Sequence, residues 1–183
     1  MKPIYLRNTP PPGETYSHIY FLEHMANWIK PEHYLELGVR SGDSLLKISP
    51  YCNKVTGVDV VNPKFEIPLN ATIHVTTTDD YFNNINNDQF DMVFIDADHS
   101  YEQSLRDFNN VKKYVIEEGF VFLHDTSPCS EELLSPVFCN DAYKTALYIK
   151  QNYIDEWEIL TFPFNPGLTL LKKINRNKQM IWK

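Results

Sequence analysis

Short apolar segments recur along the chain, and amphipathic segments separate them. The apolar segments are rich in β-branched and aromatic residues, which favour strands. Five of them predict strands, at residues 33–39, 54–61, 71–77, 90–96 and 120–125. Strands that are apolar on both faces are typical of a parallel sheet covered by helices on both sides. The pattern therefore predicts a βαβ arrangement.

The intervening segments carry apolar residues at helical spacing. HIYFLEHMANWI predicts a helix over His18–Ile29, which Pro31 ends. Gln103 follows Ser100 at the spacing of a capping box, and the apolar stripe that begins there continues to Val115, before Gly119. Two further helices are predicted, at residues 41–49, capped by Ser41 or Asp43, and at 141–152.

The segments WEILTF and GLTLLKK close the chain, and the turn PFNP between them predicts a hairpin. The predicted fold is α/β: a Rossmann-like, doubly wound sheet, mostly parallel with a C-terminal antiparallel strand and helices on both faces. Neither a repeat nor a linker divides the chain, so we expect a single domain over 1–183. Within it we expect an N-terminal arm at 1–17, a substrate-side loop at 127–140 and a polar tail at 174–183.

Charge and cysteine content narrow the partners. The 17 basic and 24 acidic residues give a net charge of −7, which argues against a nucleic-acid partner and favours a small uncharged or cationic molecule. The chain lacks the long apolar run of a membrane span and the apolar core of a signal peptide. Its three cysteines form no CxxC pair, which is typical of a reduced, cytoplasmic protein. A homodimer is an open possibility.

Polar side chains gather where the predicted strands end. In open parallel sheets, ligands bind outside the carboxyl ends of the strands, near the point where the strand order reverses. Each such residue alone fits a helix cap or turn, but together they predict a binding site. The residues are Glu36, Asp59, Thr78 to Asp80, Asp96 to His99, and His124 to Thr126.

The first strand leads into ELGVRSGD, which predicts a ligand turn. Gly38 and Gly42 allow the backbone to turn tightly and approach a ligand at the start of the next helix. The dinucleotide fingerprint GxGxxG is absent, because the spacing here is GxxxG. Asp59 ends the second strand about twenty residues on, where an acid commonly binds ribose hydroxyls. The glycine turn and Asp59 together indicate an adenosine-containing cofactor.

Four segments, ELGVRSGDS, GVDVV, FDMVFIDADHSY and GFVFLHDTSP, resemble the class I S-adenosylmethionine-dependent methyltransferases in content, order and spacing. The resemblance is greatest to small-molecule O-methyltransferases, both the metal-dependent catechol type and sugar and macrolide enzymes. It implies that S-adenosyl-L-methionine is the cofactor and that the partner is a small-molecule methyl acceptor. The cofactor-binding residues that it implies are Glu36, Gly38, Val39, Arg40, Ser41, Asp59, Thr78, Asp79, Asp96 and Ala97.

The same resemblance implies a divalent metal site. In the metal-dependent members, an Asp ends the fourth strand and an Asp-Asn pair ends the fifth. Asp96 and Asp125 match the acids, and Thr126 stands in the Asn position. A hard cation such as Mg²⁺ would anchor the substrate oxygens and lower the pKa of the acceptor hydroxyl. His99 stands where the catechol-type enzymes have Lys, and an imidazole near its ordinary pKa of ~6.5 is a suitable general base. Asp98 is expected only to begin the helix, and His124 to face a neighbouring helix.

Three alternatives remain open. The chain could be a metal-independent methyltransferase acting on an amine or a carboxylate. It could also be a nicotinamide-dependent oxidoreductase, although the missing GxGxxG counts against this. Finally, the Thr126 substitution leaves open a cofactor-binding protein whose catalytic groups have decayed.

Overall fold

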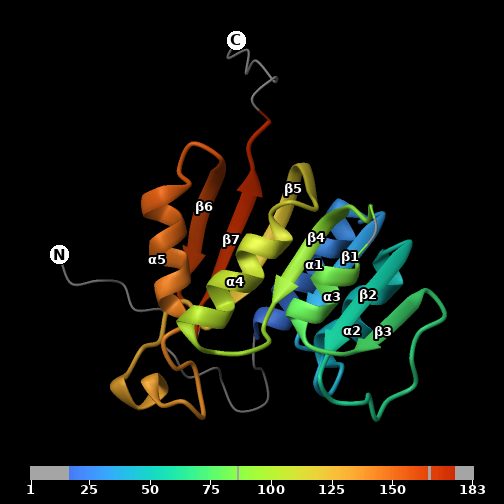
Figure 1. Cartoon of the computed structure of the whole chain (residues 1–183), viewed down its shortest axis with the longest axis horizontal. Coiled ribbons are helices and arrows are strands. Elements are labelled where there is room, and N and C mark those ends of the chain that lie inside the picture. The colour runs from blue at the N-terminus through green and yellow to red at the C-terminus, as the bar shows by residue number, and fades with distance from the viewer. Residues whose placement is uncertain (1–16, 86, 165, 176–183) are drawn as a thin grey trace.

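A seven-stranded sheet forms the centre of the computed structural model, which describes residues 17–85, 87–164 and 166–175 (Figure 1). The strand order is β3-β2-β1-β4-β5-β7-β6. The first five strands pair in parallel, and β7 runs antiparallel to both β5 and β6. The strands are β1 (His33–Leu37), β2 (Lys54–Asp59), β3 (Ala71–Val75), β4 (Phe90–Ile95), β5 (Val115–His124), β6 (Trp157–Phe162) and β7 (Leu168–Lys173).

Helices cover both faces of the sheet, which completes the three layers that the apolar strands predict (Figure 1). One face carries α1 (His18–Ile29) and α2 (Asp43–Ile48), followed by the short 3₁₀ helix η1 (Ser49–Tyr51). The other face carries α3 (Thr78–Asn84), α4 (Tyr101–Val111) and α5 (Tyr143–Asn152). A second 3₁₀ helix, η2 (Glu131–Leu134), lies between β5 and α5. The α/β fold with a C-terminal antiparallel strand is thus confirmed.

Each face of the sheet has its own buried core. Leu22 of α1 and Leu45 of α2 are fully buried in one core, together with residues of β1, β4 and β5. Phe108 of α4 and Ile149 of α5 are buried in the other. Because alternate side chains of each strand point to opposite faces, both sets must be apolar, which explains the continuous apolar runs.

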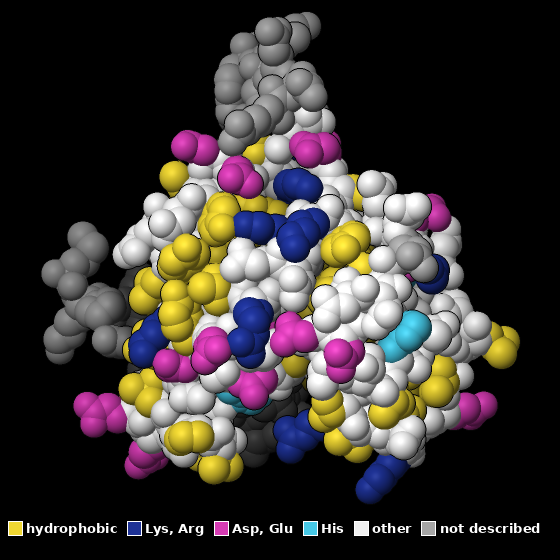
Figure 2. Space-filling model, in the orientation of Figure 1, with side chains coloured by type: hydrophobic (Ala, Val, Ile, Leu, Met, Phe, Trp, Pro, Cys, Tyr) yellow, Lys and Arg dark blue, Asp and Glu magenta, His cyan; other side chains and the backbone are white. Residues whose placement is uncertain are grey.

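The strand order reverses between β1 and β4. From β1 the chain moves outward through β2 and β3, then returns to place β4 on the other side of β1. The carboxyl ends of these parallel strands lie along the lower edge of Figure 1. In the space-filling view, acidic side chains lie across the lower half of this face together with basic and apolar ones (Figure 2). The fold therefore brings the polar strand ends together at the position where such sheets bind ligands.

The helix predicted from Ser100 is shorter than expected. It ends at Val111, and Val115 and Gly119 belong to β5 instead. Val115 pairs with Phe90, whereas Phe120 pairs with Met92, so the residues between Val115 and Phe120 form a bulge in the strand. Val115 fits helical spacing but is buried as a strand residue, because the fifth strand begins before the glycine.

The helix starts differ in how well the sequence predicts them. Ser100 caps α4 as expected, since its hydroxyl accepts a hydrogen bond from the Gln103 backbone N–H at 3.3 Å. At α2 the N-cap is Gly42, with a φ of 81°, so neither Ser41 nor Asp43 caps that helix. The helix α3 was not predicted, because its short polar sequence follows the third strand directly.

Parts of the predicted organisation lie outside the described residues. These are the N-terminal arm, apart from its last residue, and the tail beyond residue 175. None of the helices that the structure describes is long and apolar enough to cross a membrane. Cys52, Cys129 and Cys139 all lie within the described residues, and none of them is in a disulfide bond.

Candidate functional site

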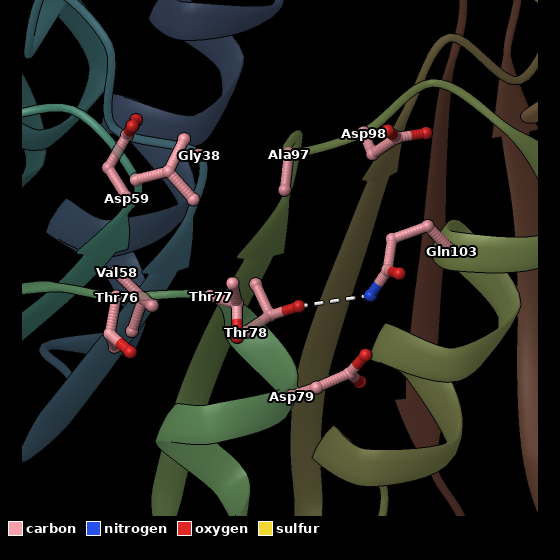
Figure 3. A pocket seen from close by; sticks show the side chains of 11 residues that line it. Gly38, Val58, Asp59, Thr76, Thr77, Thr78, Asp79, Ala97, Asp98 and Gln103 are labelled. Atoms are coloured by element: carbon pink, nitrogen blue, oxygen red, sulfur yellow. Dashed lines mark hydrogen bonds between the residues drawn. The ribbon is translucent and has the colours of Figure 1, made fainter.

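A cavity of about 370 Å³ opens at the carboxyl ends of β1, β2 and β4 (Figure 3). This volume lies within the range of small-molecule and cofactor sites. Its lining is made mainly of small and hydroxyl-bearing residues with three carboxylates. The lining residues are Gly38, Val58, Asp59, Val60, Thr76, Thr77, Thr78, Asp79, Ala97, Asp98 and Gln103.

Gly38 forms the wall of the cavity between β1 and β4. Its φ is 88°, a conformation that strongly favours glycine, and its N–H donates to the Val58 carbonyl at 2.9 Å. A Cβ at this position would lie 2.2 Å from the Asp96 carbonyl oxygen, which is backbone and has no room to move. The glycine therefore lets the turn after β1 lie directly against the end of β4.

Asp59 stands at the second side of the cavity with a fixed orientation. Its Oδ2 accepts the Arg40 backbone N–H at 2.7 Å, and its Oδ1 accepts the Val61 backbone N–H at 2.8 Å. A carboxylate has about four lone-pair sites, so each oxygen keeps one for a further donor. Two adjacent hydroxyl groups, such as those of a ribose, match this arrangement.

A hydrogen-bonded network forms the opposite wall. Gln103 Nε2 donates to Thr78 Oγ1 at 3.0 Å (Figure 3). It also donates to Asp107 Oδ1 at 2.9 Å, and Thr78 Oγ1 donates to the same Asp107 oxygen at 2.6 Å. Asp107 is fully buried, and burial raises the pKa of its carboxyl to about 6 although both hydrogen bonds oppose this. The network holds Thr78 and Gln103, from α3 and α4, in fixed positions at the cavity.

Glu36 lies beneath the cavity and not in its wall. It is fully buried, and its carboxyl accepts the Tyr34 hydroxyl at 2.7 Å and the Ser44 hydroxyl at 2.5 Å. Burial raises the pKa of Glu36 to about 8, against the effect of these two hydrogen bonds. The residue thus joins β1 to α2 and supports the glycine turn from below.

The predicted cofactor residues divide into two groups. Gly38, Asp59, Thr78, Asp79 and Ala97 line the cavity. Glu36, Val39, Arg40, Ser41 and Asp96 lie elsewhere: the first two are buried, Arg40 offers its backbone N–H to Asp59, Ser41 bonds to Asp43, and Asp96 belongs to a second site.

That second site is a cluster of three imidazoles and two carboxylates beside the cavity. We call it the carboxylate–imidazole cluster; it consists of His18, Asp96, His99, His124 and Asp125. His124 Nδ1 lies 2.9 Å from Asp96 Oδ1 and 3.3 Å from Asp125 Oδ1, and His99 Nδ1 lies 3.0 Å from Asp125 Oδ2. The cluster therefore joins the ends of β4 and β5 to the first residue of α1.

The backbone conformation of Asp125 is unusual, and its neighbours set the charge state of its carboxylate. Its φ is 59°, in the left-handed region that non-glycine residues seldom adopt outside functional sites and turns. Its carboxylate is buried, which by itself would raise its pKa, but hydrogen bonds from His99 and from the Cys139 thiol and the charge of His124 lower the pKa overall. Asp125 therefore stays ionised.

His99 is held by Asp125 and by the loop that follows β5. Its Nδ1 contacts both the Asp125 carboxylate and the carbonyl oxygen of Phe138. The hydrogen bond to Asp125 raises the pKa of His99 to about 9, although partial burial opposes the shift. The expectation of an imidazole near its ordinary pKa is therefore wrong for the metal-free site, where the ring is protonated at neutral pH.

The rings of His18 and His124 lie against one another, with centroids 3.9 Å apart and planes tilted by 45°. Burial and the neighbouring His124 lower the pKa of His18 to about 4, so this ring is neutral at pH 7. Burial would also lower the pKa of His124, but Asp96 outweighs it and raises the pKa. The buried Nε2 of His124 has no hydrogen-bond partner among the described residues. His124 faces α1, as predicted, and also reaches the cluster.

Thr126 turns away from the cluster. It is buried, and its hydroxyl accepts a hydrogen bond from Thr169 Oγ1 of β7 at 2.8 Å. Asp98 has the local role that the sequence predicts, since its Oδ1 accepts the Ser100 backbone N–H at 2.7 Å before α4 begins. Of the three predicted metal ligands, Asp96 and Asp125 lie together and Thr126 does not join them.

The loop predicted at 127–140 lies over His99. Phe138 supplies the carbonyl that His99 contacts, while its side chain and that of Val137 are 53% and 82% exposed. The loop thus presents apolar surface beside the cluster, which suits a substrate-side position.

Sequence reasoning missed His18, Asp107 and the role of Gln103 at the cavity. His18 is the first residue of an amphipathic helix, where a polar residue is common and therefore does not indicate a functional site. Gln103 was noticed only for its capping position. Asp107 carried a usable signal, because it occupies a buried position on the face of α4 that packs on the sheet. A carboxylate at such a position is rare without a hydrogen-bonding role.

Comparisons with known proteins agree with this geometry. A family model described as a methyltransferase domain matches residues 35–126, half of the chain. A search of curated protein sequences found no match.

Solved structures share the fold at low sequence identity. TomG, an O-methyltransferase of tomaymycin synthesis from Streptomyces achromogenes solved with S-adenosylmethionine, superimposes with a TM-score of 0.67 at 13% identity, over 88% of this chain and 82% of that one. The methyltransferase PaMTH1 from Podospora anserina, bound to S-adenosylhomocysteine, gives a TM-score of 0.66 at 12% identity, over 88% and 80%. An O-methyltransferase from Bacillus cereus, also with S-adenosylhomocysteine, gives 0.64 at 13%, over 91% and 84%.

Proposed function

The chain belongs to the family of S-adenosylmethionine-dependent methyltransferase domains, and we propose that it transfers the methyl group to a hydroxyl of a small polar molecule. The observation that carries the proposal is the position of the carboxylate–imidazole cluster directly beside the cavity. Gly38 and Ala97 line the cavity, and the backbone of Asp96 touches Gly38 from the cluster side. A methyl donor bound in the cavity and a methyl acceptor bound at the cluster would therefore lie on either side of Asp96.

The cavity suits the cofactor in shape and chemistry. Asp59 has free lone pairs for two ribose hydroxyls, and its orientation is already fixed by two backbone N–H groups. Asp79 and Thr78 lie at the far wall, where a carboxylate and a hydroxyl can meet the polar edge of adenine. The reactive sulfonium would then lie toward Ala97 and Gly38.

We assign to His99 the role of general base, which accepts the proton of the acceptor hydroxyl. Methyl transfer is an in-line displacement: the acceptor oxygen forms a bond to the methyl carbon while the bond from carbon to sulfur breaks, and the hydroxyl proton must leave. The contact between Asp125 and Nδ1 fixes the ring and directs Nε2 to serve as the base, as the carboxylate does in a catalytic triad.

We propose further that Asp96 would help to hold a divalent cation, with Asp125 as a second carboxylate nearby. The described residues offer two groups of potential ligands that share Asp96, and in each group the ligand atoms lie within 4.8 Å of one another. When bound, the cation supplies a positive charge that lowers the pKa of the acceptor hydroxyl. The same charge would lower the pKa of His99 from about 9, so that the ring could accept a proton near neutral pH.

A product assay tests the proposal. Wild-type protein is incubated with S-adenosylmethionine and a panel of small hydroxyl, amine and carboxyl acceptors, with and without EDTA. We expect methyl transfer to hydroxyl acceptors only, and its loss in EDTA. Turnover of an amine or carboxyl acceptor that EDTA leaves untouched would favour the metal-independent alternative. Cofactor binding without turnover of any acceptor would favour a decayed enzyme.

A further inference from the structure

Asp96 belongs to two groups of potential metal ligands in the part of the chain that the structure describes. In each group the ligand atoms lie within 4.8 Å of one another. One group is Asp96, His99 and Asp125, and the other is His18, Asp96 and His124. The residues of the first group all follow the ends of β4 and β5, whereas the second group includes His18, the first residue of α1. The question is which group completes the cation site.

The first group already has a different task. Asp125 Oδ2 binds His99 at 3.0 Å, and its carboxylate also accepts the Cys139 thiol. His99 is committed in turn to Asp125 and to the Phe138 carbonyl through the same nitrogen. If Nδ1 of His99 became a metal ligand, both contacts would be lost and the proposed base would be consumed. This pair is better explained as a proton-transfer pair.

The second group places another imidazole beside a charged pair. Asp96 Oδ1 lies 2.9 Å from His124 Nδ1. The His18 ring lies against that of His124, with centroids 3.9 Å apart and planes tilted by 45°. An ion shared by the three residues would bind His124 through Nδ1, because Nε2 points away from Asp96.

The chemistry of this group selects the kind of ion. Imidazole nitrogens suit Fe²⁺, Ni²⁺, Cu²⁺ and Zn²⁺, whereas Mg²⁺ prefers oxygen ligands; Mn²⁺ is the weakest-binding of the divalent transition metals at such sites and therefore the most stringent probe. Two imidazoles and one carboxylate form a ligand set that binds divalent transition metals and leaves positions open for substrate oxygens. We propose that His18, Asp96 and His124 hold a divalent transition metal ion, and that Asp125 serves His99 instead of the metal.

The arrangement divides the cluster into two working halves. The metal half comes from the start of α1, the residue after β4 and the end of β5. The proton half consists of Asp125, which follows β5, and His99, which lies between β4 and α4. His18 is the first residue of α1, whose Leu22 and Ala26 are fully buried against the sheet. The helix therefore presents the ligand from a rigid support. This inference rests on the proposed function, which it refines by naming the ligands and the metal class.

Isothermal titration calorimetry with MnCl₂ and with MgCl₂, in the absence of cofactor, tests the ligand set. The wild-type protein is compared with His18→Gln, His124→Gln, Asp96→Asn and Asp125→Asn. His24→Gln is the matched control, because His24 is an exposed histidine on the same helix. Thermal unfolding without metal confirms that each variant is folded, and methyl transfer by the wild type is measured separately.

We expect one Mn²⁺ per chain, bound at least about tenfold more tightly than Mg²⁺. The variants at His18, His124 and Asp96 should each lose about 100-fold or more in Mn²⁺ affinity, while His24→Gln and Asp125→Asn change it by less than about fivefold. A large loss in Asp125→Asn with none in His18→Gln would overturn the inference and leave the cation at the two carboxylates. Mg²⁺ binding as tightly as Mn²⁺, or no binding of either metal, would also overturn it, and methyl transfer that survives EDTA would show that the enzyme needs no ion.

Discussion

The cofactor cavity and the carboxylate–imidazole cluster lie on either side of the end of β4, yet they are built differently. The cavity is lined by residues at and after the ends of β1, β2, β3 and β4, and the carboxylate of Asp59 in its wall is held by backbone N–H groups. The cluster draws on α1, β4 and β5, and its groups are held by one another. A site held by the backbone is formed before ligand arrives, whereas one held by charged neighbours depends on their protonation and on a cation.

His99→Gln should produce the largest effect on the cluster side. Gln keeps a polar side chain of similar size but has no basic nitrogen, so we expect the turnover number to fall by about 10²- to 10⁴-fold. The dissociation constant for S-adenosylhomocysteine, measured by calorimetry, should stay within about threefold of the wild-type value, because His99 does not line the cavity. An equal loss of cofactor binding would show that His99 supports the cavity instead, and His24→Gln serves as the unaffected control.

Gly38→Ala should produce the largest effect on the cavity side. The new Cβ meets the Asp96 backbone at 2.2 Å in a left-handed conformation, so we expect a loss of at least about 2 kcal/mol in the free energy of unfolding. Cofactor affinity should fall as well. Gly57→Ala is the matched comparison, because the nearest atoms to its Cβ are side-chain ends that can shift. Equal losses in the two variants would contradict the close approach of β1 and β4.

Glu36→Gln should change how stability depends on pH. Burial raises the pKa of Glu36 to about 8 in the folded protein, so its contribution to stability is fully present below its unfolded pKa of about 4.5. That contribution is lost as pH rises through 8, by at most about 5 kcal/mol. Gln stays neutral, so the variant should gain stability relative to the wild type between pH 5 and 8 in urea unfolding. A constant difference over this range would mean that Glu36 is already ionised at pH 5.

Thr126→Val should have the smallest effect. Its hydroxyl accepts a hydrogen bond from Thr169, so its loss should lower the free energy of unfolding by about 1 kcal/mol. Mn²⁺ affinity should stay within about threefold of the wild-type value, since the hydroxyl faces β7. If affinity fell tenfold or more in calorimetry, Thr126 would return to the ligand set that the family resemblance implies.

The contrast between the two sites also explains what the sequence could predict. The cavity follows from local patterns: a strand, a glycine turn and an acid at the next strand end appear in order, and the alternation of elements brings them to one edge. Gly38 and Asp59 follow from this pattern, whereas the cofactor roles of Thr78, Asp79 and Ala97 are implied by the family resemblance. The parallel sheet and its closing hairpin follow from the same periodicity.

The cluster depends on contacts that no local pattern records. His18 reaches it only because α1 packs across the sheet with its first turn at the strand ends, which requires the tertiary fold. Asp125 faces His99 because its backbone is left-handed, and Thr126 turns to β7 because the antiparallel strand lies there. The early start of β5 was missed for a related reason, since a bulge lets a helical spacing occur within a strand.

The most direct test is a crystal structure of the protein with S-adenosylhomocysteine and Mn²⁺, with anomalous data collected for manganese. We expect the nucleoside between Asp59 and Thr78, the cofactor sulfur toward Ala97, and one anomalous peak at ligand distance from Asp96 on the other side of the end of β4. A cofactor bound outside the cavity, or a manganese peak away from Asp96, would contradict the proposal that donor and acceptor meet at this strand end.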